Sequence, residues 1–384
     1  MTIRLYEQDS ELLDFTATVL SCEPKGNLYL VELDRTAFFP EGGGQGADHG
    51  QLGNAQVTDC HDVHGTILHT LSAPLTPGST VEGHVDGVRR LSMMQQHSGE
   101  HIFSGLVHQH FGYNNVGFHI GSDAVTMDFD GKMTLEDALH IEYLVNEAIW
   151  KDLPVQAYYP GTEALEHIDY RSKKAIDGDV RIVTIEGYDT CACCGTHVKH
   201  TGQIGQVKVT AFQNYKSGVR ISILCGMRAL AFENELLSEN REVSHITSAK
   251  TGELAAAVAH LTEERDHLRY EMSRMASQLF TSLVSAAQDS FPVLRADFLP
   301  VAQLRPSAGE AAESRRGALV ISKREDGWNY AMCSKEMDVR PVSRELQRLF
   351  SGKGGGTPDM VQGVLGAGTE EDIRAAVPSL LPDA

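Results

Sequence analysis

The chain has 384 residues, of which 41% are hydrophobic and 22% charged; this composition excludes a disordered chain and suits a soluble protein of two or three domains. No apolar run approaches the roughly 20 residues that cross a bilayer, and the acidic start MTIRLYEQDSELLDF is unlike a secretory signal, so we expect a cytoplasmic protein without membrane contact. The formal net charge of −19 excludes bulk attraction to nucleic acid.

Residues 1–90 are expected to form a small β-barrel domain. Short segments of alternating polarity are separated by turn residues, with no helical period between them; they include FTATVLSCEP, NLYLVEL, AQVTDC and TVEGHVD. Strands this close together in sequence are typical of a small barrel or sandwich.

Residues 91–230 are expected to form an α+β domain. Residues 89–111 have the pattern of an amphipathic helix that ends at Gly112. A strand-like segment, AVTMDF, and a helical one, LEDALHIEYLVNEAIW, follow. We therefore expect the α+β class for the chain as a whole.

Residues 231–290 are expected to be a helical, coiled-coil-like spacer, interrupted near Ile246 and Gly252. Apolar residues recur at steps of three, four or seven, namely Leu254, Val258, Leu261, Leu268, Met272, Met275, Leu279 and Leu283. Such a stripe predicts packing against a partner helix. Residues 291–384 return to strand and helix alternation (GALVISK, WNYAMCSK, RELQRLF) and contain a predicted loop, SGKGGGTPDMVQG.

Two short motifs together predict a metal site. In His97-Ser-Gly-Glu-His101 the two imidazoles lie four residues apart on the predicted helix, so both can reach one ion. In Cys193-Cys-Gly-Thr-His197 a thiolate and a third imidazole have similar spacing. Chemistry alone does not decide which cysteine is the ligand, but Cys193 best matches the spacing. This set of nitrogen and sulfur ligands suits one tetrahedral Zn²⁺ per chain. The motif differs from that of metalloproteases, in which the glutamate directly follows the first histidine, because here Glu100 directly precedes the second one.

Other interpretations of these motifs remain open. The zinc could be purely structural, with all its positions filled by protein ligands. Alternatively, Cys191 and Cys194 beside Cys193 could form a redox thiol pair. The seven cysteines of the chain are an odd number, which argues against a disulfide framework.

A glycine motif, Thr36-Ala-Phe-Phe-Pro-Glu-Gly-Gly-Gly-Gln45, is the third candidate site. Consecutive glycines allow positive φ and close approach, so their N–H groups could hold a carbonyl or phosphate oxygen. A tight turn is the simpler explanation. The motif is not a P-loop, because no Gly-Lys-Ser/Thr follows it.

The chain resembles the editing part of alanyl-tRNA synthetase and the freestanding AlaX-type editing proteins. The resemblance rests on four motifs in the expected order: FFPEGGGQ (38–45), HSGEH (97–101), CCGTHVKHTGQIG (193–205) and GKGGGTPDMVQG (352–363). It extends over essentially the whole chain, including a helical insert and a C-terminal α/β DHH-associated domain at 291–384, as in the long form of AlaX. No segment is left for an ATP-using aminoacylation domain, so we expect the protein not to charge tRNA.

The resemblance implies a trans-editing hydrolase that deacylates mischarged tRNA(Ala), chiefly Ser-tRNA(Ala), with Gly-tRNA(Ala) as another substrate. A second, hydrolytic site improves fidelity because the pocket in which a synthetase activates alanine cannot strongly reject serine, which adds only a hydroxyl. The implied zinc ligands are His97, His101, Cys193 and His197. The implied substrate-contacting residues are Thr36, Gly42, Gly43, Gly44 and Gln45, with Gln45 fixing the loop.

Two departures from the family bear on substrate preference. Glu100 stands where the synthetases commonly have threonine, and His119 stands where they have a glutamine before the Gly-Ser pair. His119 is thus a candidate substrate contact, or a plain surface histidine. The alternative functions are a non-catalytic tRNA-binding module with a structural zinc, and an editor of another aminoacyl-tRNA, such as that of threonine.

The C-terminal motif predicts a contact with tRNA. By resemblance, Lys353 and the backbone of Gly354, Gly355 and Gly356 would approach phosphate; the alternative is an ordinary glycine loop. Residues 301–384 hold 11 Lys and Arg against 12 Asp and Glu, so nearly all of the net negative charge belongs to residues 1–300. We therefore expect a few oriented contacts and a shallow salt dependence of binding. The helical region 231–290 or the C-terminal domain could support a homodimer.

Overall fold

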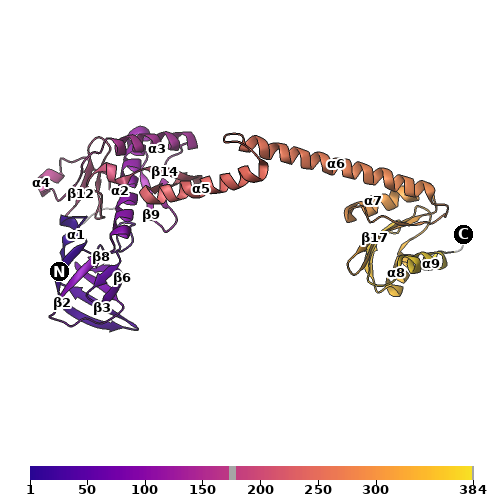
Figure 1. Ribbon diagram of the computed structural model, residues 1–384, viewed down its shortest axis with the longest axis horizontal. Coiled ribbons are helices and arrows are strands. Elements are labelled where there is room, and N and C mark those ends of the chain that lie inside the picture. The colour runs from indigo at the N-terminus through magenta and orange to yellow at the C-terminus, as the bar shows by residue number, and fades with distance from the viewer. Residues whose placement is uncertain (173–178, 383–384) are drawn as a thin grey trace. The chain divides into compact units, whose positions relative to one another are not determined.

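The computed structural model describes residues 1–172 and 179–382 (Figure 1). It divides into two compact units, Met1–Arg241 and Glu242–Ala384, and the boundary lies inside helix α5 (Gly226–Thr247). Both units contain sheets and helices, which agrees with the expected α+β class. No helix within the described ranges is both long and apolar enough to cross a membrane.

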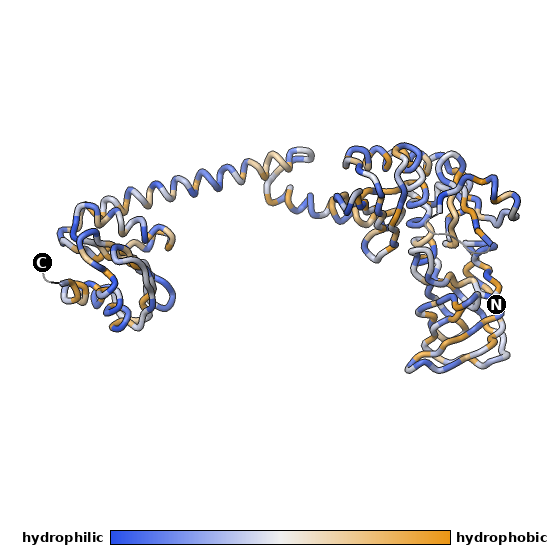
Figure 2. The backbone as a smooth tube through the Cα atoms, turned by 180° about the vertical axis from the view of Figure 1, so that it is seen from behind, coloured by the Kyte–Doolittle hydropathy of each residue, from blue (hydrophilic) through white to orange (hydrophobic). Residues whose placement is uncertain are grey.

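A closed barrel begins the first unit, with the strand order β2-β3-β7-β6-β5-β8. Its strands are β2 (Asp14–Lys25), β3 (Leu28–Leu33), β5 (Gly50–Leu52), β6 (Ala55–Val63), β7 (Thr66–Leu71) and β8 (Thr80–Val85). Alternate side chains such as Val31 and Leu33 are fully buried, as expected for strands with one face toward a core. Figure 2 shows hydrophobic and hydrophilic residues side by side along these strands.

Three short elements precede or interrupt the barrel strands in the sequence. Strand β1 (Ile3–Arg4) pairs in parallel with β4 (Arg35–Thr36), and the single-turn helix α1 (Leu5–Gln8) follows β1. The glycine motif begins at Thr36, the last residue of β4, and its Ala37 and Phe38 are buried in the barrel core, so the barrel positions this motif.

Helix α2 (Gly87–Phe111) leads from the barrel into the rest of the first unit (Figure 1). The Asp86 side chain accepts the backbone N–H of Arg89 and so caps the helix start. Gly112 ends the helix with φ of +72°, in the left-handed region that glycine tolerates. The expected helix over 89–111 and its stop at Gly112 are therefore confirmed. Its buried side chains Ile102 and Phe103 face the core of this part.

Two further sheets complete the first unit. One has the order β14-β15-β10-β9 and the other the order β11-β12-β13. Their strands are β9 (Asn115–Ile120), β10 (Val125–Phe129), β11 (Val155–Tyr158), β12 (Ile182–Ile185), β13 (Asp189–Ala192), β14 (Val207–Tyr215) and β15 (Gly218–Cys225). The helices between them are α3 (Leu135–Trp150), α4 (Thr162–Leu165) and the 3₁₀ turn η1 (Thr201–Ile204). Helix α3 matches the expected helical segment residue for residue.

The second unit joins a long helix to one mixed sheet with the order β16-β17-β18-β20-β19. Its helices are α6 (Leu254–Ala286), α7 (Val301–Ala312), α8 (Arg340–Leu349) and α9 (Glu370–Leu380). Its strands are β16 (Val293–Arg295), β17 (Ala318–Arg324), β18 (Gly327–Cys333), β19 (Lys353–Gly356) and β20 (Met360–Leu365). The break between α5 and α6 includes Gly252 at φ of +83°, where an interruption was expected.

The predicted loop around Lys353 is wrong, because residues 353–356 form the edge strand β19. Its Gly354 and Gly356 pair with Gly363 and Val361 of β20 in an antiparallel ladder. Glycine is a poor strand former by propensity, which is why the sequence indicated a loop. In the structure the neighbouring strand approaches so closely that only glycine fits: a Cβ at Gly354 would lie 2.4 Å from the Gln362 carbonyl oxygen.

Candidate metal centre and active site

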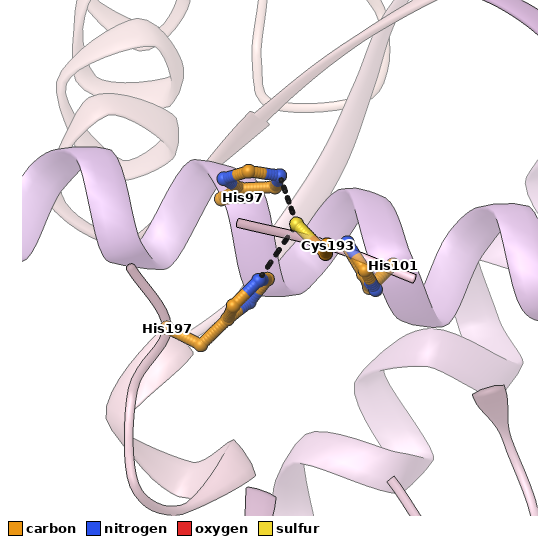
Figure 3. Close-up of side chains that lie close together, drawn as sticks. All are labelled: His97, His101, Cys193 and His197. Atoms are coloured by element: carbon orange, nitrogen blue, oxygen red, sulfur yellow. Dashed lines mark hydrogen bonds between the residues drawn. The ribbon is translucent and has the colours of Figure 1, made fainter. Parts of the chain in front are cut away.

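Four side chains from two distant segments converge in the first unit (Figure 3). His97 and His101 come from α2, whereas Cys193 and His197 come from the segment after β13. Their ligand atoms all lie within 4.8 Å of one another. The Cys193 Sγ lies 3.4 Å from Nε2 of both His97 and His197. The two motifs singled out in the sequence thus form one cluster.

The donor set fits a single zinc ion. Zinc bonds of about 2.3 Å to sulfur and 2.0–2.1 Å to nitrogen place tetrahedral ligand atoms roughly 3.5 Å apart, close to the Sγ–Nε2 distances of 3.4 Å. The three histidines are buried, whereas Cys193 is partly exposed.

Gly195 is needed to bring the second segment this close to α2. A Cβ at this position would lie 2.2 Å from Cε1 and 2.4 Å from Nδ1 of His97. Any other residue would push the Cys193–His197 segment away from the helix.

Two polar side chains orient the rings of His97 and His197. The Gln45 Oε1 lies 2.8 Å from Nδ1 of His97, and its Nε2 donates to the Thr196 hydroxyl at 2.9 Å. The Ser98 hydroxyl lies 3.1 Å from Nδ1 of His197. With Nδ1 engaged in this way, each imidazole presents Nε2 to the cluster, as metal-binding histidines usually do.

Asp189 orients the third ring and was not found from the sequence. Its Oδ2 lies 2.9 Å from Nδ1 of His101, and its Oδ1 accepts a hydrogen bond from Arg171 Nε at 2.7 Å. Burial alone would raise the pKa of Asp189, but the bond to His101 and the charges of His101 and Arg171 hold it below its ordinary value. No spacing pattern links these residues to the histidine motif, because tertiary pairing of β13 brings Asp189 to α2.

The electrostatics favour the metal-binding form at Cys193 and His197, whereas at His101 the lowering effect of burial is outweighed by Cys193 and Asp189, which raise the pKa well above its ordinary value. Burial raises the pKa of the Cys193 thiol, but the nearby His97, His101 and His197 outweigh it and lower the pKa well below its ordinary value. Burial and the charges of His97 and His101 lower the pKa of His197 to about 3. A thiolate and a neutral imidazole are the forms that bind metal.

The glycine motif lies directly against this cluster. Gly43 and Gly44 have φ of +62° and +85°, and the backbones of Gly42 and Gln45 bridge each other. A Cβ at Gly44 would lie 2.6 Å from the Phe118 ring, whose centroid is 5.2 Å from that of His97. The motif is a tight turn, and Gln45 links it to a candidate metal ligand.

Two other predicted residues lie elsewhere in the first unit. Thr36 is fully buried, and its hydroxyl lies 2.9 Å from His69 Nε2 and accepts the Phe38 N–H at 3.0 Å. Its contacts are therefore inside the barrel rather than with the four-residue cluster. His119 is exposed on β9, opposite Thr126 of β10. Lys353 and its three glycines belong to the second unit.

Comparison with known proteins finds similarity to a domain of threonyl and alanyl tRNA synthetases and to alanine–tRNA ligases. The model of the threonyl and alanyl tRNA synthetase second additional domain matches residues 180–222. An alanine–tRNA ligase of Pyrobaculum neutrophilum is 31% identical over 94% of this chain and 42% of its own length, and that of Thermofilum pendens is 30% identical with the same coverage. The chain thus spans less than half of these ligases.

A shorter relative aligns over its full length. The alanyl-tRNA editing protein AlaX-L of Pyrococcus horikoshii is 26% identical over 99% of this chain and 98% of its own. Among solved structures, the C-Ala domain of Aquifex aeolicus alanyl-tRNA synthetase is 24% identical, covering 23% of this chain and 87% of its own, with a TM-score of 0.20. That score is too low to show a shared fold.

Proposed function

The chain is similar over nearly its whole length to an AlaX-L alanyl-tRNA editing protein, as its motifs predicted, and we propose that it is a zinc-dependent hydrolase of mischarged tRNA(Ala). Its chief substrate would be Ser-tRNA(Ala), with Gly-tRNA(Ala) as a second one. The observation that carries the proposal is the His97, His101, Cys193 and His197 cluster set directly against the glycine motif.

In this proposal the protein's own groups bind and orient the ester. His97, His101, Cys193 and His197 would hold the ion. Bound there, zinc would supply a Lewis acid for the ester or for water, or an anchor for the substrate's amino group. Gln45 keeps the His97 ring in place, and the backbone of Gly42–Gly44 offers the close approach that the terminal adenosine and its ester need.

A non-catalytic tRNA-binding module with a structural zinc is the second candidate. The observation in its favour is the full set of four protein ligand groups, which would close a tetrahedral shell. Catalysis at such a site needs a fifth position, which zinc can adopt during reaction. Cys193 is the least buried of the four residues, which supports access from its side.

Deacylation of a panel of charged tRNAs tests the proposal. The protein should hydrolyse Ser-tRNA(Ala) faster than Ala-tRNA(Ala) and faster than Thr-charged tRNA, with Gly-tRNA(Ala) measured alongside. If none of these esters is cleaved faster than in buffer, while zinc is bound in one equivalent and the protein still binds tRNA, the structural-zinc module is correct and the hydrolase is not.

A pair of cysteine variants tests the metal site. Cys193→Ala should lower zinc content and deacylation together, because it removes the sulfur ligand. Cys194→Ala is the matched control, since Cys194 is the exposed neighbour outside the cluster, and it should retain zinc. Full deacylation by a zinc-free Cys193 variant would contradict the mechanism.

We also propose that the second unit contacts tRNA and that α6 pairs with a second copy of the chain. Lys353 and the glycines of β19 are exposed at a sheet edge, where a phosphate can approach. The stripe on α6 is exposed in a single copy, with Leu261 at 46%, Leu268 at 54% and Met275 at 63%. These residues are seven apart, the spacing of a coiled-coil seam.

Substitution of Leu268 tests the pairing. Leu268→Glu should convert a dimer into a monomer, because it places a charge in an apolar seam. Sedimentation velocity measures the change, and Tyr270→Glu, off the seven-residue register, should leave the mass unaltered. A wild-type chain that sediments as a monomer at micromolar concentration would contradict this proposal.

A further inference from the structure

A cleft of about 620 Å³ lies beside the glycine motif, lined by the start of α2 and the turn after β9. Arg89 of α2 and Arg228 of α5 both line it, as does Gly46, which follows Gln45. The volume is typical of a binding site for a small group. All the lining residues belong to the first unit.

Both guanidinium groups lack a carboxylate partner. Arg89 Nε donates to the Ala47 carbonyl at 2.9 Å, and Arg228 donates to the carbonyls of Gly121 and Ser122 at 2.9 and 2.6 Å. Within residues 1–172 and 179–382, neither arginine takes part in an ion pair. Two such cations at one cleft are notable in a chain with a net charge of −19.

The partial burial of the Arg228 guanidinium favours an anionic ligand. Burial is the main influence on the pKa of Arg228 and lowers it, so its guanidinium is partly removed from water. An anion in the cleft would compensate for that lost solvation with charge-assisted hydrogen bonds. Two carboxylates act on these cations: Asp86 lines the cleft and accepts the Arg89 backbone N–H at the helix start, and the charge of Asp123 raises the pKa of Arg228 against the effect of burial. Among the lining residues the two arginines outnumber the single carboxylate of Asp86, so the lining keeps a positive balance for an anion.

The helix places this cleft at a defined distance from the metal cluster. Arg89, Met93 and His97 follow one another at steps of four on α2, so each lies about one turn beyond the last. Eight residues of helix correspond to about 12 Å between Arg89 and His97. The glycine motif connects the two places, because Gln45 contacts His97 and the next residue, Gly46, lines the cleft.

We propose that this cleft binds the backbone phosphates of the last nucleotides at the 3′ end of tRNA, with Arg89 and Arg228 as the phosphate ligands. The inference rests on the proposed deacylase function and extends it to a second subsite. The aminoacyl ester lies at the His97–His197 cluster, the terminal adenosine at the glycine motif, and the preceding phosphates in the cleft. Arginine suits this role because its planar fork can donate two hydrogen bonds to one phosphate.

Two small substrates separate a phosphate contact from a general effect on the site. One is 2′(3′)-O-seryladenosine, which has no phosphate, and the other is the seryl ester of CpCpA. Arg89→Gln and Arg228→Gln should each raise KM for seryl-CpCpA on the order of tenfold, which corresponds to about 1.4 kcal/mol, and leave kcat unchanged. Neither variant should alter kcat/KM for seryladenosine. Arg89→Lys, which keeps the charge but not the two-donor fork, should recover only part of the loss.

A matched control and a binding measurement complete the test. Arg35→Gln removes the same charge from an exposed site on the first unit, where Arg35 pairs with Asp34, and should change neither substrate's kinetics. Equal losses on seryladenosine and seryl-CpCpA, or no loss on either, would overturn the phosphate subsite.

If the wild-type protein cleaves neither ester, the deacylase function fails, and binding of fluorescently labelled, uncharged CpCpA tests the cleft by itself. The wild type should then bind this trinucleotide about tenfold more tightly than Arg89→Gln does. Equal binding by both proteins would overturn the subsite independently of any hydrolysis.

Discussion

The side chain of Gln45 connects the barrel to the candidate metal site, through bonds to His97 and Thr196. We expect Gln45→Leu to lower zinc affinity about 10–100-fold, because the His97 ring loses the acceptor that fixes its orientation. Competition with a chromophoric chelator measures the affinity. Gln56→Leu, at an exposed position on β6, is the matched control and should bind zinc as the wild type does. Unaltered affinity in the Gln45 variant would show that α2 alone orients His97.

The sequence could predict candidate ligands but not all of the side chains that orient them. His97 and His101 are recognisable because helix geometry relates positions four apart, and the Cys193–His197 motif has the same spacing. Asp189 is 88 residues from His101 and reaches it only through the packing of β13. Thr36 belongs to the glycine motif by sequence, yet its hydroxyl is bonded inside the barrel, a direction that only the folded strands determine.

Strand β19 combines a lysine with three glycines at the edge of a sheet. If Lys353 contacts one tRNA phosphate, Lys353→Gln should reduce the slope of log K against log salt by about 0.9. The overall slope should itself be shallow. Filter binding at several salt concentrations measures both, with Lys335→Gln as a control at another exposed lysine of the same unit. A slope that does not change would remove Lys353 from the interface.

Elements with a strong local signal were predicted well. Helix α3 begins at a Thr134–Asp137 capping box and α2 ends at Gly112, and both signals are visible in the sequence. Strand β19 was predicted as a loop because its glycines have no side chains to show alternation, and pairing with β20 determines its conformation. The three-residue strand β5 was not predicted, because it is too short to show a period.

Removal of zinc should destabilise the two units unequally. All four candidate ligands lie in Met1–Arg241, and no cluster of three potential ligands was found in the described residues of the second unit. A ligand at about 1,000 times its Kd stabilises by about 4 kcal/mol, so chelation should lower the melting temperature of the first unit by roughly 10 °C. The second unit should melt as before.

The two tryptophans of the chain allow this to be measured in the intact protein. In Trp150→Phe the remaining Trp328, 3% exposed, reports on the second unit alone. Chelator should shift the melting transition seen by circular dichroism and leave the Trp328 fluorescence transition in place. An equal shift of both would show either that zinc stabilises the second unit as well or that the two units unfold together.

Helix α2 carries Arg89 of the cleft and His97 and His101 of the cluster on one continuous stretch of chain. An insertion or deletion of a single residue between Arg89 and His97 would turn one set relative to the other by about 100° and shift it by 1.5 Å. Homologues that share both sites should therefore keep the length of this interval unchanged, while the loops around it vary in length.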